Sequence, residues 1–336
     1  MSLRLSFSDV LEPGQNVLVT GATGFIGSHL ALRLMEQGIR VRGLARSAAR
    51  GAWLAQRGVE IVEGDLTDAA SLRCAARGCH IIFSVAAWPG RPNSWDAARR
   101  INVEGTRALV EAAIAAGAQR LIHTSSIAAY GFLDAGVVDE TCPLRAADPY
   151  GVIKAQSESV VLTYADRIEV SLLRPAQVFG PRGGAWTTLL FDSVKRGLPI
   201  LVNGGRGTFH PCYVENLVDA YLLAATRAAA VGEAFTIVDG VTTWSEFVGY
   251  YARMVGRSAR SVPAAPVKIG LSMYLAWCRL TRRSPVAARD WLKALLGSSR
   301  YSNEKAKRLL GWSPRVSIDE GMRRTEAWLR EAGRLR

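Results

Sequence analysis

The chain has few of the residues that build disulfide frameworks or metal sites. Its 336 residues include only five cysteines, at positions 74, 79, 142, 212 and 278, and only four histidines. The cysteines are odd in number and none shows Cys-x-x-Cys spacing, so we expect no disulfide framework, no zinc site and no other metal. Such cysteine usage fits a reducing compartment, and we expect a cytoplasmic protein.

Long apolar runs are also missing. None reaches the roughly 18 residues that a membrane span requires, and residues 1–15 lack the apolar core of a signal peptide. Aromatic residues make up only 8% of the chain, whereas hydrophobic residues make up 49%. This is enough apolar material for one large domain, or for a domain with a smaller lobe.

Acidic residues are scarce relative to basic ones. There are 29 Asp and Glu residues against 42 Lys and Arg residues, which gives a formal net charge of +13. A basic surface suits nucleic acid, an anionic membrane or a phosphorylated cofactor. No nucleic-acid-binding motif accompanies the charge and arginine is spread over the whole chain, so we expect no nucleic-acid partner.

Three glycines near the N-terminus stand between an apolar strand, expected at residues 17–19, and an amphipathic helix. Gly21 allows a tight turn, Gly24 lets backbone approach a pyrophosphate, and Gly27 lets the helix pack on the strand. The phosphates would lie at the helix N-terminus, where unpaired N–H groups favour an anion. The residues predicted here to bind a dinucleotide are Gly21, Thr23, Gly24, Phe25, Ile26 and Gly27.

Strand and helix patterns alternate along the first half of the chain. After the first strand, we expect strands at residues 39–44, 59–63, 80–85, 120–124 and 168–173. The alternation predicts an α/β fold: a Rossmann-like, doubly wound parallel sheet with a smaller C-terminal α/β substrate lobe. We expect a dinucleotide-binding domain over residues 1–175, to which later strands return, and a mainly substrate-binding lobe over residues 176–336. Ligands of such sheets bind at the carboxyl ends of the strands.

The end of the second strand indicates which nucleotide is bound. An acidic residue at this position hydrogen-bonds the ribose 2′-hydroxyl of NAD, but this chain has Arg46, followed by Ser47 and Arg50. A cation suits the 2′-phosphate of NADP(H), which we predict as the preferred cofactor. NAD remains the alternative, in which Arg46 is simply a solvated loop residue.

Other cofactor contacts are expected at later strand ends. Asp65, followed by Leu66, either accepts a hydrogen bond from the adenine amine or caps the helix that begins near Asp68. Ala86 and Ala87 are small enough for a cofactor to lie across the fourth strand. The segment that begins at Pro175 and includes Val178 is expected to cross the nicotinamide. These residues complete the predicted cofactor site: Arg46, Asp65, Leu66, Ala86, Ala87, Tyr150, Lys154, Pro175 and Val178.

Three further residues carry the predicted chemistry. Tyr150 and Lys154 are four residues apart, so they lie on one face of the expected helix. A nearby ammonium favours the phenolate and so lowers the pKa of a tyrosine toward neutrality. Ser126, at the end of the fifth strand, is positioned to hydrogen-bond a substrate oxygen. Together they predict a general acid/base site.

With these residues in place, the sequence resembles an extended short-chain dehydrogenase/reductase of the NAD-dependent epimerase/dehydratase family. The resemblance covers nearly the whole chain, and its C-terminal part lies in Leu-Gly-Trp-Ser-Pro at residues 310–314. The other motifs that carry it are Gly21–Gly27, Gly64-Asp65-Leu66, Asn102–Thr106, Thr124–Gly131, Tyr150–Lys154, Leu173-Arg174-Pro175 and Gly180-Pro181.

The resemblance implies roles for individual residues. Tyr150 would be the acid/base, Lys154 would hold the nicotinamide ribose and lower the pKa of Tyr150, and Ser126 would position the reacting oxygen. Asn102 would support the site structurally. Members of the family often dimerise through the helices that contain Asn102 and Lys154, so a homodimer is left open.

Three classes of function fit this family. They are a ketoreductase or alcohol dehydrogenase similar to 3β-hydroxysteroid dehydrogenase or dihydroflavonol reductase, a nucleotide-sugar epimerase or dehydratase, and an inactive dinucleotide-binding regulator. The intact Ser126, Tyr150 and Lys154 disfavour the regulator. Dehydratases have Thr-Asp-Glu where this chain has Ser-Ile-Ala at residues 126–128, so the carboxylates for water loss are missing.

One aligned position separates the two remaining classes. Nucleotide-sugar enzymes place an arginine, which contacts the diphosphate, where this chain has Phe209, while Val-Glu-Asn at residues 214–216 resembles the steroid dehydrogenase branch. We therefore predict NADP-dependent hydride transfer to or from a hydrophobic ketone or secondary alcohol, steroid-like or of similar bulk. A nucleotide-sugar 4-epimerase stays the alternative, because Arg206 could reach a phosphate from a shifted position.

Apolar residues of the second half are candidates for the substrate site. Trp186, Leu189, Leu190 and Phe191, together with the apolar residues 269–277, offer surface for such a substrate. The segment 266–280 is followed by Thr-Arg-Arg, and is either a core helix or a helix that lies in a membrane interface. A peripheral membrane contact is thus left open. The predicted substrate contacts are Trp88, Ser126, Phe179, Trp186 and Phe209.

Overall fold

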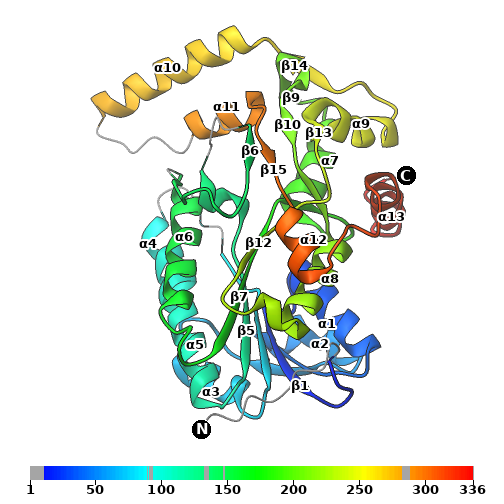
Figure 1. Ribbon diagram of the computed structural model, residues 1–336. Coiled ribbons are helices and arrows are strands. Elements are labelled where there is room, and N and C mark those ends of the chain that lie inside the picture. The colour runs from blue at the N-terminus through cyan, green and yellow to red at the C-terminus, as the bar shows by residue number, and fades with distance from the viewer. Residues whose placement is uncertain are drawn as a thin grey trace.

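The computed structural model describes residues 11–88, 90, 94–131, 136–146, 148–281 and 288–335. At its centre lies a seven-stranded sheet in which every neighbouring pair is parallel, with the strand order β12-β7-β5-β4-β1-β2-β3 (Figure 1). The chain reverses its direction of travel across the sheet between β1 and β4. The fold is therefore the predicted doubly wound Rossmann-like sheet. Its strands are β1 (Asn16–Thr20), β2 (Arg40–Ala45), β3 (Glu60–Glu63), β4 (Ile81–Ser84), β5 (Arg120–Thr124), β7 (Glu169–Pro175) and β12 (Ala234–Ile237).

Helices cover both faces of this sheet. One face packs on α3, α5 and α6 through a core that includes Leu72, Leu109 and Val161, and the other packs on α1, α2 and α8 through Leu30 and Leu217 (Figure 1). Because both faces are covered, the central strands are buried along their whole length. The flanking helices are α1 (Phe25–Glu36), α2 (Ala48–Ala55), α3 (Ala69–Ala76), α5 (Gly105–Ala115), α6 (Pro149–Leu162) and α8 (Val214–Thr226).

The long helix expected at residues 95–116 is present but is not uniformly α-helical. It consists of α4 (Trp95–Arg99), a π-helical segment (Arg100–Glu104) and α5. Such π segments are rare and occur often at functional sites. This one contains Asn102, whose contacts are described below.

The second lobe is built from short strand pairs around an aromatic core. It includes Phe179, Phe191, Phe209, Phe247 and Tyr251, all fully buried. Because β12 returns to the main sheet from within this half, the lobe is not a separate stretch of chain; the boundary near residue 175 stays a prediction. Its elements are β8 (Gln177–Phe179), a π-helical segment (Gly184–Leu189), α7 (Leu190–Lys195), β9 (Pro199–Val202), a 3₁₀ turn (Asn203–Gly205), β10 (Thr208–Phe209), β11 (Pro211–Tyr213), β13 (Thr242–Thr243), α9 (Trp244–Met254) and β14 (Arg260–Val262).

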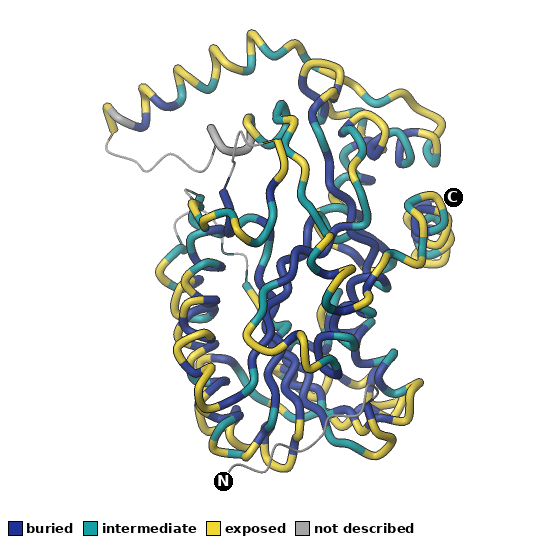
Figure 2. Tube along the Cα trace, in the orientation of Figure 1, coloured by how far each residue is buried: buried dark blue, intermediate teal, exposed yellow. Residues whose placement is uncertain are grey.

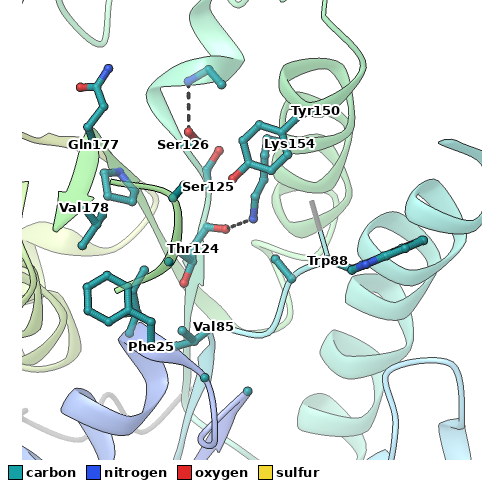
Figure 3. A pocket seen from close by; sticks show the side chains of 18 of the residues that line it. Phe25, Val85, Trp88, Thr124, Ser125, Ser126, Tyr150, Lys154, Gln177 and Val178 are labelled. Carbon is teal, nitrogen blue, oxygen red and sulfur yellow. Dashed lines mark hydrogen bonds between the residues drawn. The ribbon is translucent and has the colours of Figure 1, made fainter. Parts of the chain in front are cut away.

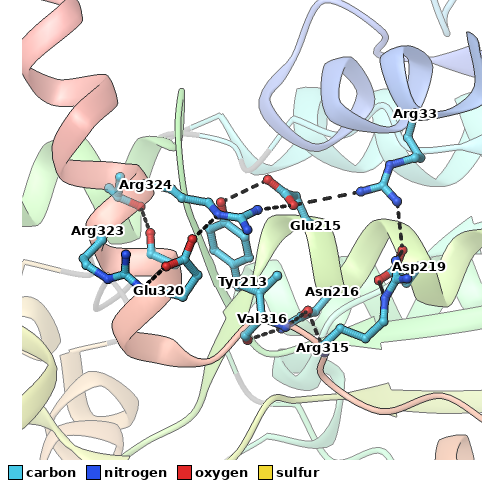
Figure 4. A network of polar contacts seen from close by, with 12 residues as sticks. Arg33, Tyr213, Glu215, Asn216, Asp219, Arg315, Val316, Glu320, Arg323 and Arg324 are labelled. Atoms are coloured by element: carbon cyan, nitrogen blue, oxygen red, sulfur yellow. Dashed lines mark hydrogen bonds and ion pairs between the residues drawn. The ribbon is translucent and has the colours of Figure 1, made fainter. Parts of the chain in front are cut away.

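The C-terminal segment ties the two halves together. Asn216, fully buried in α8, donates from Nδ2 to the carbonyl of Val316 (2.9 Å), and its Oδ1 accepts from the backbone of Arg315 and Val316. Around it, Glu215 and Asp219 pair with arginines of α1 and of the C-terminal segment, as Figure 4 shows. The Val-Glu-Asn motif thus has a structural role: it anchors the C-terminus on α8.

The remaining elements lie at the end of the molecule that holds the carboxyl ends of the strands, or beside α8. Figure 1 shows α10 along the edge of the molecule next to α11. No helix in the part of the chain that the structure describes is long and apolar enough to cross a membrane. These elements are β6 (Val137–Val138), 3₁₀ turns at Ile127–Tyr130 and Ala228–Ala230, α10 (Ala264–Leu280), α11 (Ala288–Leu296), β15 (Arg300–Tyr301), α12 (Glu304–Leu310) and α13 (Ile318–Glu331).

Candidate active site

A cavity of about 1050 Å³ opens at the carboxyl ends of the parallel strands, on both sides of the point where the strand order reverses. Ligands of open α/β sheets bind at this place. All predicted cofactor residues and all three predicted catalytic residues line the cavity. Of the predicted substrate contacts, Trp88, Ser126 and Trp186 line it, whereas Phe179 and Phe209 do not.

Gly21 and Gly27 line the cavity, and at both positions neighbouring backbone lies too close for a side chain. Gly21 has a φ of +66°, and a Cβ there would lie 2.8 Å from the Cα of Ala86. A Cβ on Gly27 would lie 2.2 Å from the carbonyl oxygen of Gly21, so any side chain would push α1 off β1. The N-terminus of α1 has neither a side-chain cap nor an acidic residue in its first turn. Its free N–H groups therefore face the cavity as an anion site.

The end of the cavity next to α2, where the adenosine of a dinucleotide would bind, is basic. Arg46, which lies between β2 and α2, and Arg50, in the first turn of α2, both line it. Asp65 also lines it, and its Oδ1 accepts from the backbone N–H of Thr67 (2.9 Å) and from the Thr67 hydroxyl (2.8 Å). These hydrogen bonds and the charge of Arg46 lower the pKa of the Asp65 carboxyl. The alternative cap is excluded, because Asp68 itself caps α3 through the N–H of Ala70.

Tyr150 and Lys154 project from α6 toward the end of β5, where Ser126 follows the strand (Figure 3). Asp148 caps this helix by accepting from the N–H of Gly151, and Pro149 occupies the first turn, so α6 begins immediately before Tyr150. Lys154 is buried and donates from Nζ to the carbonyl of Thr124 (2.8 Å). Ser126 Oγ accepts from the N–H of Ala128 (3.1 Å) and is hydrogen-bonded to Tyr150.

The pKa of Tyr150 moves in the opposite direction from the one we predict. Burial raises it to about 12, and the hydrogen bond with Ser126 only partly offsets this effect. Burial also lowers the pKa of Lys154 to about 8, against the smaller influence of Glu158. The expected lowering of the Tyr150 pKa is thus wrong for this structure, because desolvation of the phenol dominates and Lys154 is not among the groups that shift this pKa. The phenol of Tyr150 is therefore neutral at pH 7.

A buried hydrogen-bond chain behind Lys154 was not predicted from the sequence. His123 contacts Ser84 Oγ through Nδ1 and Ser157 Oγ through Nε2, each at 3.1 Å, and Ser157 donates to the carbonyl of Lys154 (2.8 Å). Because Ser157 uses its proton on Lys154, it accepts from Nε2–H of His123. Burial and the charge of Lys154 lower the pKa of His123 to about 3, so the ring is neutral. The only signal in the sequence was a histidine that follows two apolar residues of this strand.

Asn102 holds the loop that follows β4. Its Oδ1 accepts from the N–H of Trp88 (2.8 Å), and its Nδ2 donates to the carbonyls of Trp88 (2.6 Å) and Ala98 (2.8 Å). Asn102 does not line the cavity itself, whereas Trp88 does. The structural role that the resemblance implies for Asn102 therefore consists of fixing the backbone of a cavity residue.

The substrate end of the cavity differs in two respects from our expectation. Phe209 is fully buried and stacks on Phe247 with ring centroids 4.0 Å apart, and Phe179 is buried between Tyr213 and Phe247. Both side chains belong to the core behind the wall, because the two-residue strand β10 and the neighbouring β8 turn them inward. Phe179 and Phe209 therefore lie outside the cavity and are not substrate contacts.

The wall itself is largely aromatic and apolar, with a few polar groups. Trp186, which lines the cavity, rests on Phe209 with ring centroids 5.7 Å apart. Leu189, Leu190, Phe191 and the described residues of α10 do not line the cavity, in contrast to our expectation. The residues lining this end are Trp88, Ala97, Ile101, Gln177, Val178, Trp186, Thr208, His210, Trp244, Lys293, Ala294, Ser299 and Tyr301.

The loop after β8 contacts helices α1 and α2. His29 of α1 is hydrogen-bonded through Nε2 to the carbonyl of Pro181 (2.9 Å), and the guanidinium of Arg182 lies 3.6 Å from the ring centroid of Trp53 in α2. Arg182 holds a φ of +69°, which a non-glycine residue rarely adopts. These contacts join the second lobe to α1 and α2.

The groups that line the cavity fit a bound dinucleotide. The glycine turn leaves room that a Cβ would fill, the uncapped α1 terminus suits a pyrophosphate, and Arg46 stands at the adenosine end. Lys154 and Tyr150 stand where the nicotinamide end would reach the strand ends. Within the described ranges, no group of three or more His, Cys, Asp and Glu side chains is arranged to hold a metal ion.

Comparison with known proteins supports this assignment. The model of the "NAD dependent epimerase/dehydratase family" matches residues 17–237, more than half of the chain. The chain is 30% identical to a 4-hydroxy-2-methyl-3-oxo-4-farnesyl-3,4-dihydroquinoline-1-oxide ketoreductase of Stigmatella aurantiaca, over 90% of this chain and 93% of that protein. It is 31% identical to a 2-alkyl-3-oxoalkanoate reductase of Stenotrophomonas maltophilia, over 93% and 98% respectively.

Relatives of the alternative class are also similar. The chain is 31% identical to a UDP-glucose 4-epimerase of Mycolicibacterium smegmatis, over 93% of this chain and 98% of that protein. Among solved structures, the crystal structure of gox2253 superposes with a TM-score of 0.83 at 26% identity, over 96% of this chain and 99% of that one. The chain belongs to the NAD-dependent epimerase/dehydratase family of extended short-chain dehydrogenases/reductases, and it is an NAD(P)-dependent oxidoreductase that acts on CH–OH or C=O groups.

Proposed function

We propose that this enzyme is an NADPH-dependent ketoreductase that reduces a hydrophobic ketone to a secondary alcohol, or catalyses the reverse reaction. The observation that carries the proposal is the apolar, tryptophan-rich wall of the cavity next to Tyr150. An apolar wall stabilises an apolar ligand by about 25 cal/mol per Å² of surface buried. Two reductases among the relatives support it, since their names give a farnesylated quinoline oxide and an alkylated oxoalkanoate as substrates.

The residues of the site account for the proton. A bound nicotinamide would supply the hydride that adds to the carbonyl carbon. Tyr150, neutral at pH 7 because its pKa is about 12, donates its proton to the carbonyl oxygen, which becomes the alcohol oxygen. Ser126 hydrogen-bonds that oxygen and holds it against the phenol. Lys154, whose Nζ already donates to the carbonyl of Thr124, supports the phenolate that results.

The preference for NADPH rests on the adenosine end. Arg46 and Arg50 line the cavity there, and a 2′-phosphate would accept hydrogen bonds from either guanidinium. Glu63, which ends β3, is not among the cavity residues and accepts from the backbone N–H of Ala48. Asp65 is engaged by Thr67. These contacts support NADPH, whereas the family as a whole is described as NAD dependent.

The nucleotide-sugar alternative is favoured by the epimerase among the relatives. A buried diphosphate requires cations, because unpaired buried charge is very costly. Arg206 is exposed and does not line the cavity, and Phe209 occupies the core. At the substrate end, Lys293 is the one Lys or Arg that lines the cavity within the described residues. This supports an uncharged or singly charged substrate over a nucleoside diphosphate.

Steady-state kinetics test the proposal. The wild type and Arg46→Asp are assayed with NADPH and NADH against a panel of ketones with long alkyl, isoprenoid or steroid bodies, and UDP-glucose is assayed for epimerisation. We expect a higher kcat/KM with NADPH in the wild type, and a reversed preference in Arg46→Asp. Turnover of UDP-glucose without reduction of any ketone would favour the epimerase instead.

A further inference from the structure

The helix α10 carries an apolar stripe on its exposed side. Ile269, Met273, Trp277 and Leu280 are 62%, 69%, 45% and 85% exposed, respectively. Their spacing of four, four and three residues places all four side chains on one face of the helix. Only Leu275 and Cys278 are buried among its described side chains. Figure 2 shows this helix as a mostly exposed rod along the edge of the molecule.

The stretch of sequence that contains this helix carries charge of a single sign. From Glu246 to Asp290 the sequence contains no acidic residue between these two. Arg253, Arg257, Arg260 and Lys268 are exposed in the part of this segment that the structure describes. The basic residues between Glu246 and Asp290 are Arg253, Arg257, Arg260, Lys268, Arg279, Arg282, Arg283 and Arg289.

An apolar stripe beside basic residues, with a tryptophan at its edge, is the pattern of a helix that lies in the plane of an anionic membrane surface. A water-soluble protein partner would need acidic groups around an apolar groove, whereas an anionic bilayer offers apolar acyl chains and negative headgroups together. The net charge of +13 favours the same partner. We propose that α10 docks the enzyme on anionic lipid bilayers.

The position of α10 connects this surface with the cavity. It lies at the end of the molecule that holds α11, whose Lys293 and Ala294 line the substrate end (Figure 1). A hydrophobic ketone dissolved in the bilayer would thus meet the enzyme at the end of the molecule that holds the substrate end of the cavity. Docking itself does not depend on the proposed reaction, so the two proposals fail independently.

Vesicle co-sedimentation tests the docking. The full chain is mixed with vesicles of equimolar phosphatidylcholine and phosphatidylglycerol, and with vesicles of phosphatidylcholine alone. We expect binding to the anionic vesicles that weakens with salt, and about a tenfold or larger loss for Ile269→Glu and for Met273→Glu. Leu162→Glu, which adds the same charge at a 44% exposed leucine of α6, should bind as the wild type does. NADPH binding, measured by fluorescence, serves as the folding control for each variant.

Three results would overturn the proposal. The first is no sedimentation of the wild type with either kind of vesicle. The second is equal binding by the wild type, Ile269→Glu and Met273→Glu, which would assign the binding to charge alone. The third is a wild-type dimer, in sedimentation velocity without lipid, that Met273→Glu dissociates, which would show the stripe to be an interface between copies. Quenching by brominated phosphatidylglycerol that decreases in Trp277→Phe would support insertion of the stripe.

Discussion

The side-chain amide of Asn102 clasps the backbone of Trp88 from both sides, accepting from its N–H at 2.8 Å and donating to its carbonyl at 2.6 Å. The same Nδ2 group also donates to Ala98. An amide is required, because one side chain must offer an acceptor and a donor at once. The loop after β4 therefore has its shape set from within the π-helical segment.

Replacement of the Asn102 amide tests the role of its hydrogen bonds with Trp88. Asn102→Asp keeps the size but turns the donor toward Trp88 into an acceptor, so the part-buried carbonyl of Trp88 and the buried carbonyl of Ala98 lose this hydrogen bond. We expect a stability loss of about 1–3 kcal/mol and a higher KM for ketone, with a smaller effect on kcat. Urea denaturation measures the loss of stability, and steady-state kinetics measure KM and kcat. Gln119, an amide outside the cavity, provides a control through Gln119→Glu, which should leave the KM unchanged.

Removal of the Tyr150 hydroxyl should abolish the chemistry but not cofactor binding. Tyr150→Phe keeps the ring, and we expect turnover to fall by about 10²–10⁴-fold while NADPH still binds. Tyr130→Phe is the matched control. Its hydroxyl bonds to Thr236 (2.8 Å) and Arg174 (3.0 Å) and does not face the cavity, so this variant should lose stability and keep its turnover. Normal turnover in Tyr150→Phe would assign the acid to another group.

Burial of Lys154 predicts a specific dependence of stability on pH. Its pKa is about 8 in the fold against 10.5 for a free lysine, so between these values the unfolded chain holds a proton that the folded chain has released. Stability therefore rises with pH across this interval, by about 3 kcal/mol for the full difference. Lys154→Met removes the titrating group and with it this pH dependence of stability. The gap in unfolding free energy between wild type and variant should shift in favour of the wild type from pH 8 to pH 10.5; a constant gap would contradict the lowered pKa.

His123 predicts sensitivity to acid. Its pKa is about 3 in the fold against 6.5 in the unfolded chain, so below pH 6.5 the unfolded chain takes up a proton that the folded chain does not. Stability must fall as the pH decreases from 6.5 toward 3. His123→Gln retains a donor and an acceptor but cannot titrate. Urea midpoints at pH 7, 5.5 and 4.5 should decline more steeply for the wild type than for His123→Gln.

Much of the site followed from the sequence, because its determinants are local. The glycine spacing specifies a turn, the interval from Tyr150 to Lys154 specifies one helical face, and parallel strands bring their carboxyl ends to one edge. These rules placed Ser126, Tyr150 and Lys154 around one cavity without tertiary information. The absence of an acidic residue at the end of the second strand, where Arg46 stands, required no structure either.

What the sequence did not show depends on packing between distant segments. Whether Phe209 faces a ligand or the core is decided by Trp244 and Phe247, which lie in another part of the chain. The raised pKa of Tyr150 depends on how deeply its ring is buried in the folded protein. The chain of hydrogen bonds through His123 joins three elements that only the folded sheet brings together.

The most direct test of the account is isotope transfer from the cofactor. The enzyme is incubated with NADPH in which both hydrogens at C4 of the nicotinamide are deuterium, and with a hydrophobic ketone from the panel. The products are analysed by mass spectrometry and NMR. The account predicts one deuterium on the carbinol carbon of the alcohol, formed by the wild type and not by Tyr150→Phe. Epimerisation of UDP-glucose with no deuterium in any ketone product would contradict it.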